Sequence, residues 1–136
     1  MLNDYSGELL ADIDLGMFTK EALIDLLELY GKLWLATDGF WYLTVKERLR
    51  NEDALACDLS FWEKYSKYEA QRLTKIMGIK GNDVAAFIKN FQVSPWFRNL
   101  EHKLEIKTRN HILLTVVNCP TLLALEKEGE GRENSI

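Results

Sequence analysis

The sequence predicts an α+β fold: an N-terminal helical layer of about four helices, then an antiparallel β-hairpin and a C-terminal helix. Three observations carry this prediction. Apolar residues recur at helical spacing through most of the first 91 positions. The spacing then changes to alternation over 100–108, and a β-branched run follows at 111–117 after the turn dipeptide Arg109–Asn110. Pro120, directly after that run, is typical of the first turn of a new helix.

The 136 residues divide into three parts. Residues 1–18 mix glycine, aspartate and apolar residues without a sustained period, and we interpret them as an arm. Residues 19–128 form a single α+β domain in which the helical layer packs on one face of the sheet. Residues 129–136 form a polar tail.

The first helix of the domain is expected to be long. Thr19 is a suitable N-cap for a helix that begins at Lys20. Its apolar residues lie on most sides, so we expect it to be largely buried. Gly31 and Gly39 each weaken a helix by roughly 1 kcal/mol relative to alanine. They therefore permit close packing or mark a kink.

Two further helices are expected before the sheet region begins. Asn51 is the predicted cap of a short helix over 52–57, and Asp58 is the predicted cap of the main helix over 59–77. Residues 83–91 then form a short amphipathic helix.

Composition excludes several classes of partner. The net charge is −4 and the isoelectric point is near 5.2, and no basic patch accompanies the aromatic residues, so we expect no nucleic acid partner. No apolar run approaches the length that spans a bilayer, and the acidic N-terminus does not resemble a signal peptide. The two cysteines, Cys57 and Cys119, form no disulfide framework, which favours a cytoplasmic location.

Glu69 is the most unusual position in the predicted helices. It projects onto the apolar face of the main helix, beside Trp62. A carboxylate buried alone costs several kcal/mol, so Glu69 must be paired, protonated or bound to a ligand. Two interpretations remain open: an ion pair with Arg72 or Arg48, or a carboxylate that faces a pocket.

The leading functional hypothesis is a small-molecule pocket between the helices and the sheet. The aromatic residues expected to line it are Trp41, Trp62 and Tyr65. The residues expected to make polar contacts are Asp38, Asp58, Glu69 and Arg72. An ordinary apolar core is the alternative for the aromatic residues.

Cys119 and the histidines are the remaining candidates for chemistry. Cys119 immediately precedes a helix start, where backbone N–H groups favour a thiolate, although an inert buried cysteine is the alternative. His102 and His111 are expected to lie near one another across the hairpin, as surface or turn residues. The chain contains no HExxH or CxxC motif, so we expect no metal site, and no particular cofactor is indicated.

The helical segment carries a longer motif: D-G-x-W, then a Glu, then A-x-x-x-D-x-x-x-W, then E-A-x-R. In this chain those positions are Asp38, Gly39, Trp41, Glu47, Ala54, Asp58, Trp62, Glu69, Ala70 and Arg72. The motif resembles that of the DUF6125 type, a prokaryotic and archaeal family of uncharacterised cytosolic proteins, over roughly residues 20–131. The run VVNCPTLLALEKEGEG is distantly similar to an element of L-2-amino-thiazoline-4-carboxylate hydrolase-like proteins.

The resemblance implies hydrolysis of a small ring or amide, with Cys119 as nucleophile or ligand and Glu69 as proton carrier. Relatives continue into further strands, so we expect this chain to be a short or truncated form. The alternative function is a non-catalytic interaction module that forms a homodimer. Its interface would be the arm residues Leu9, Leu10 and Ile13 together with the open edges of the hairpin.

Overall fold

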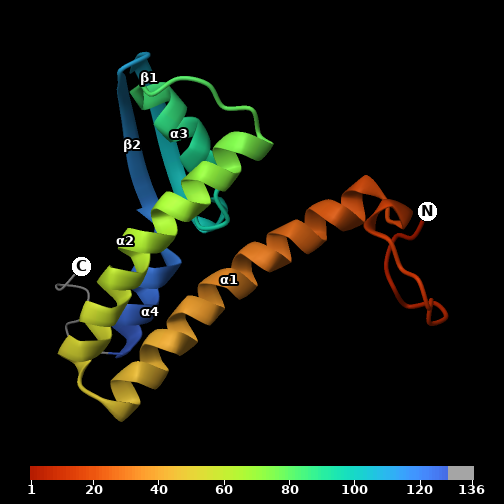
Figure 1. Cartoon of the computed structure of the whole chain (residues 1–136), viewed down its shortest axis with the longest axis horizontal. Coiled ribbons are helices and arrows are strands. Elements are labelled where there is room, and N and C mark those ends of the chain that lie inside the picture. Colours follow the sequence, from red (N-terminus) through yellow and green to blue (C-terminus); the bar gives the residue numbers. More distant parts are fainter. Residues whose placement is uncertain (129–136) are drawn as a thin grey trace.

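The computed structural model describes residues 1–128, and the predicted polar tail, 129–136, lies outside the described residues. Figure 1 shows the arrangement of the elements. In chain order they are η1 (Leu15–Met17), α1 (Lys20–Arg48), α2 (Asn51–Ile76), α3 (Val84–Gln92), η2 (Phe97–Asn99), β1 (Glu101–Thr108), β2 (His111–Asn118) and α4 (Pro120–Glu128), where η denotes a single-turn 3₁₀ helix. The predicted α+β class is confirmed.

Helix α1 begins where the sequence predicts. The hydroxyl of Thr19 accepts a hydrogen bond from the backbone N–H of Ala22 at 3.3 Å, which satisfies one of the free donors of the first turn. The helix is 29 residues long. Its C-terminal half lies beside α2, whereas its first turns project away from the rest of the fold and carry residues 1–18 at the far end (Figure 1). The expectation that this helix is largely buried is wrong.

Helix α2 is continuous from Asn51 to Ile76, so the predicted helix break and cap at Asp58 are wrong. At the start of the helix, Arg50 occupies the N-cap position that the sequence predicts for Asn51. No glycine or proline interrupts the segment, and residues around Asp58 such as Ala54 favour helix, so nothing forces the backbone to leave helical geometry there. Asp58 therefore presents its carboxyl group from the middle of a helix.

Aromatic side chains hold α1 against α2. The rings of Trp62 and Tyr65 each lie 5.1 Å from the ring of Trp34, which donates a hydrogen bond from its indole N–H to the hydroxyl of Tyr65 at 3.2 Å. Near the turn between the helices, the hydroxyl of Tyr42 donates to the side-chain carbonyl of Asn51 at 3.1 Å. Such aromatic pairs contribute about 0.5–1.5 kcal/mol each beyond their buried area.

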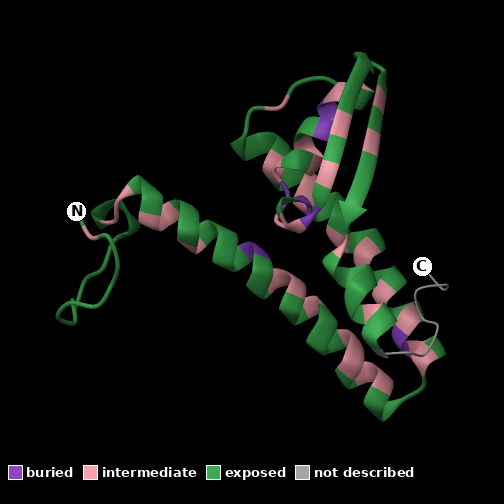
Figure 2. Ribbon diagram, turned by 180° about the vertical axis from the view of Figure 1, so that it is seen from behind, coloured by how far each residue is buried: buried purple, intermediate pink, exposed green. Residues whose placement is uncertain are grey.

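The buried residues gather around α3, η2 and the start of the hairpin (Figure 2). Apart from Ala54 and Gly31, the buried residues of the described chain are Ala86, Ile88, Ser94, Phe97 and Leu100. Phe97 lies at the centre of this cluster, with its ring 4.7 Å from Phe91 and 4.1 Å from His102. The core of this chain is therefore small, and it lies in the second half of the sequence.

Strands β1 and β2 form the predicted antiparallel hairpin, the two-stranded sheet of the described residues. Its turn is fixed to the start of α3: the backbone N–H of Ala85 donates to the carbonyl of Arg109 at 3.1 Å, and the Arg109 side chain pairs with Asp83, the N-cap of α3. His102 pairs with Val116 near one end, and His111 pairs with Thr108 at the other. The expectation that the two histidines lie near one another is therefore wrong, because they occupy opposite ends of the hairpin.

Candidate functional site

The main cavity of the protein lies between α2, α3, the end of β2 and the start of α4, and its volume is about 1140 Å³. A smaller cavity of about 340 Å³ lies between α1, α2 and α4. Asp38, Leu55, Asp58 and Thr121 line both cavities, so the two adjoin at these residues. Pockets for small-molecule ligands typically measure about 300–1,000 Å³, so the smaller cavity lies within this range and the main cavity lies slightly above it.

Five of the predicted site residues line the main cavity. They are Asp38, Asp58, Trp62, Glu69 and Cys119. Three of these come from α2, where a spacing of three to four residues places side chains on one face of a helix. Asp38 reaches the cavity from α1, and Cys119 from the junction of β2 with α4. The structure thus brings together residues that are up to 81 positions apart in sequence.

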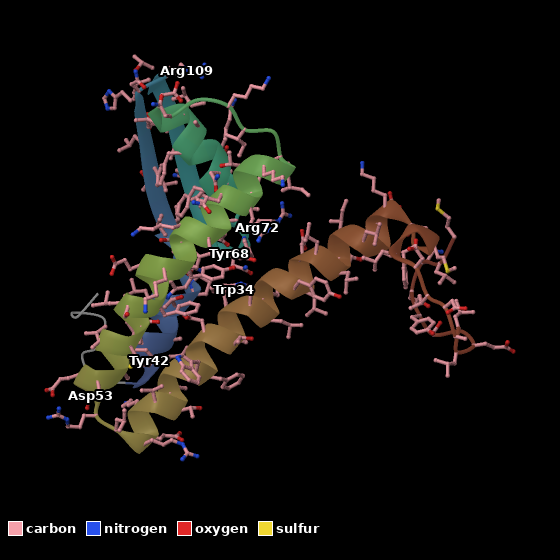
Figure 3. All side chains as sticks on the ribbon, viewed as in Figure 1. Trp34, Tyr42, Asp53, Tyr68, Arg72 and Arg109 are labelled. Carbon is pink, nitrogen blue, oxygen red and sulfur yellow. The ribbon has the colours of Figure 1, made fainter. Side chains whose placement is uncertain are left out.

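The other three predicted residues line neither cavity. Tyr65 belongs to the contact between α1 and α2, where it accepts the hydrogen bond from Trp34. The guanidinium of Arg72 lies over the ring of Tyr68, 4.9 Å from its centroid, on the side of α2 that faces α1 (Figure 3). Trp41 is 58% exposed. Trp41, Tyr65 and Arg72, which the sequence predicts in the pocket, therefore lie outside the lining of both cavities.

Glu69 faces the main cavity and forms no ion pair with any residue in 1–128. Arg72, one of its two expected partners, contacts Tyr68 instead. Arg48, the other, lies exposed at the C-terminal end of α1. Burial alone raises the pKa of Glu69, because removing water disfavours the charged form. Of the two interpretations that the sequence left open, the geometry matches the carboxylate that faces a pocket.

Asp38 and Asp58 form a pair of carboxyl groups where the two cavities adjoin. Burial and the nearby charge of Asp58 raise the pKa of Asp38 to about 6, while a hydrogen bond from Trp62 opposes the shift. Burial also raises the pKa of Asp58, and a hydrogen bond from Trp62 lowers it by a smaller amount. The indole N–H of Trp62 is a donor only, so it stabilises the ionised form of each carboxyl group. The site therefore holds one carboxyl group that changes its charge close to neutral pH.

The raised pKa of Asp38 predicts a pH-dependent stability. Between about pH 3.8 and pH 6 the folded protein keeps a proton that the unfolded chain has lost. Asp38 therefore contributes stability that is fully present at low pH and is lost as the pH rises through about 6. We expect Asp38→Asn to raise the melting temperature relative to wild type at pH 7.5, and the difference to shrink toward zero below pH 4. Melting curves of both proteins across this range test the prediction, and a pH-independent difference would contradict it.

The structure adds aromatic residues that the sequence did not indicate as cavity residues. Phe87, Phe91 and Trp96 line the main cavity. Their rings are in contact, with centroids 6.0 Å apart for Phe87 and Phe91 and 5.0 Å apart for Phe91 and Trp96. The available signal was a tryptophan in the loop after Ser94–Pro95, since a loop is a costly place for so large an apolar side chain unless something covers it.

The main cavity is acidic. Its charged lining residues are Asp38, Asp58, Glu69 and Asp83, and of these Asp83 pairs with Arg109. No lysine, arginine or histidine is among the described residues that line either cavity. No group of three or more His, Cys, Asp and Glu in residues 1–128 is arranged to hold a metal ion. The geometry thus combines an aromatic wall with carboxyl groups that lack a neutralising cation.

The fold and cavity define a class: an α+β protein with an open, acidic cavity between a helical pair and a hairpin. Residues 16–131 match the family DUF6125, a family of unknown function, and the chain belongs to this family. No curated protein and no solved structure matches the chain. Within residues 1–128, none of the helices has the length and apolar character needed to cross a membrane.

Proposed function

We propose that this protein binds a small cationic molecule with an apolar body, such as a primary amine, in the main cavity. The observation that carries this proposal is the lining itself: three carboxyl groups without a basic partner among the described residues, Asp38, Asp58 and Glu69, lie beside Trp62, Phe91 and Trp96. A cation offsets the unfavourable proximity of Asp38 and Asp58, and aromatic faces attract cations as well as apolar surface.

The pH dependence of binding follows from the same groups. A cation binds the ionised form of Asp38, so its affinity rises as the pH rises through about 6. Ligand binding in turn lowers the pKa of Asp38, because an opposite charge nearby favours the carboxylate. An anionic ligand would show the opposite trend.

Calorimetric titration with 2-phenylethylamine and with 3-phenylpropionic acid tests the proposal. We expect the amine to bind at pH 7.5, at least tenfold more weakly at pH 5, and the acid not to bind at either pH. Glu69→Gln should weaken amine binding about tenfold without lowering the melting temperature, since it removes a partly buried charge that has no ion-pair partner.

Glu63→Gln is the matched control, because Glu63 lies on the same helix, is 74% exposed and pairs only weakly with Lys67 at 3.8 Å. It should leave the affinity unchanged. Binding of the acid as tight as that of the amine, or equal losses in Glu63→Gln and Glu69→Gln, would contradict the proposal.

The hydrolase-like activity that the resemblance implies has weaker support. Cys119 and Glu69 line the same cavity, which a shared reaction would require. A nucleophilic cysteine needs a base within hydrogen-bond reach, and Cys119 has no histidine or carboxylate partner in the described part of the chain. We therefore propose binding rather than catalysis. We also propose a reducing, cytoplasmic setting, which the two free cysteines support.

A separate observation favours a second function, homodimer formation. A compact monomer of 15.8 kDa exposes roughly 7,300 Å² of surface. This chain exposes 10457 Å², which is about 3,000 Å² more. A standard protein–protein interface covers about 800 Å² of each partner, so the excess is larger than a stable dimer needs.

A further inference from the structure

Part of the exposed apolar surface lies on α1. Five large apolar residues of this helix lie within about 120° of one another. Three of them, Leu29, Leu33 and Phe40, lie on the side opposite Gly31, which is the residue that packs against the Pro95–Asn99 segment. They are Leu29 (48% exposed), Tyr30 (55%), Leu33 (51%), Phe40 (71%) and Trp41 (58%). We call this set the outer stripe. The charged residues between its ends, Lys32 and Asp38, project to other sides of the helix.

An apolar stripe of this kind is unusual on a helix whose other side already packs on its own chain. A surface helix of a globular protein normally carries one apolar stripe toward the core and polar residues elsewhere. Helix α1 contacts α2 through Trp34, and it contacts the η2 segment through Gly31 and Glu28. The side of α1 that faces its own chain is therefore already packed. The residues of the outer stripe are 48–71% exposed, although Phe40 also lines the smaller cavity. Trp41, seven positions after Trp34, borders the side of α1 that packs on α2.

We propose that the outer stripe of α1 pairs with the same stripe of a second copy, with the two helices antiparallel about a twofold axis near Leu33 and Thr37. The proposal rests on the homodimer named above and specifies its surface. An isologous contact requires one patch that is complementary to itself, and an apolar stripe centred on the middle of a 29-residue helix meets that requirement. The helix is about 43 Å long, which is enough for a continuous contact.

The position of the arm agrees with the antiparallel orientation. This orientation brings residues 1–18 of one copy beside the α1–α2 turn of the other, where Leu49 is 60% exposed. Leu9, which is 89% exposed, would gain a neighbouring apolar surface there.

Light scattering coupled to size-exclusion chromatography tests the proposal on the full chain, with the dimer dissociation constant measured by analytical ultracentrifugation. We expect a wild-type dimer, and we expect Leu33→Glu to raise the dissociation constant at least a hundredfold because it places two carboxylates at the centre of the contact. Leu33 is half exposed in the single chain, so the variant should fold. Phe40→Ser, at the most exposed position of the stripe, provides a second variant if Leu33→Glu does not fold.

Leu113→Glu is the matched control, since Leu113 lies on the hairpin and is 47% exposed. It should leave the dimer intact. A monomeric wild type would overturn the homodimer itself, whereas a Leu33→Glu variant that remains dimeric would overturn this surface alone. Amine binding reports on the cavity separately, because the outer stripe contributes little to its lining.

Discussion

Replacing Phe97 by alanine is expected to lower the free energy of unfolding by about 3–5 kcal/mol, the usual cost of removing a buried phenylalanine ring. Phe97 is only 3% exposed and contacts both Phe91 and His102. Since the core contains few other buried apolar side chains, few neighbours can move into the cavity that the substitution leaves. A loss of this size is a large fraction of the stability of a typical domain.

Urea denaturation followed by circular dichroism measures this change, with both proteins at the same concentration because dimerisation adds to apparent stability. Phe87→Ala serves as the matched control. Phe87 is 66% exposed, and its replacement should cost less than 1 kcal/mol. Equal losses in the two variants would show that the core is not centred on Phe97.

Gly31→Leu is expected to destabilise the protein by about 1–3 kcal/mol through overpacking. A Cβ atom at position 31 would lie 3.1 Å from the side-chain nitrogen of Asn99 and 3.3 Å from the backbone carbonyl oxygen of Pro95. Asn99 cannot move freely, because the same nitrogen donates a hydrogen bond to the Pro95 carbonyl at 3.0 Å. A leucine side chain would therefore force α1 away from the η2 segment.

Gly39→Ala, on the same helix, is expected to stabilise the protein. No heavy atom lies within 4 Å of a Cβ atom built at Gly39. Alanine there should raise the free energy of unfolding by about 0.5–1 kcal/mol, because glycine loses more conformational entropy in a helix. Thermal denaturation of both variants distinguishes the two glycines, and a stable Gly31→Leu protein would mean that α1 does not pack on the Pro95–Asn99 segment.

The residues of the candidate site were predicted from the sequence only in part. The sequence pattern places Asp58, Trp62 and Glu69 on one helix and puts the Glu69 carboxyl group on its apolar face. It does not decide whether Glu69 meets Arg72 or a cavity, because residues three apart on a helix are neighbours that can still face different elements. The structure turns Arg72 toward Tyr68 and leaves Glu69 at the cavity.

The same limit explains the aromatic residues. Trp41 and Trp62 both recur at helical spacing, and periodicity alone cannot tell a side that packs from a side that stays open. Helix α1 carries apolar residues on more sides than α2 and the η2 segment can cover. Trp41 therefore remains exposed, while Trp62 contacts Trp34 and the two carboxyl groups.

The sequence by itself determined the elements of this protein: the cap at Thr19, the hairpin with its turn at Arg109–Asn110, and the helix that begins at Pro120. These features depend on interactions between residues a few positions apart, which composition and spacing record directly. The tertiary structure alone decided which helix faces meet, and so which carboxyl groups share a cavity and lose water. Those outcomes depend on contacts between distant segments, and the raised pKa of Asp38 beside Asp58 exists only once these contacts form.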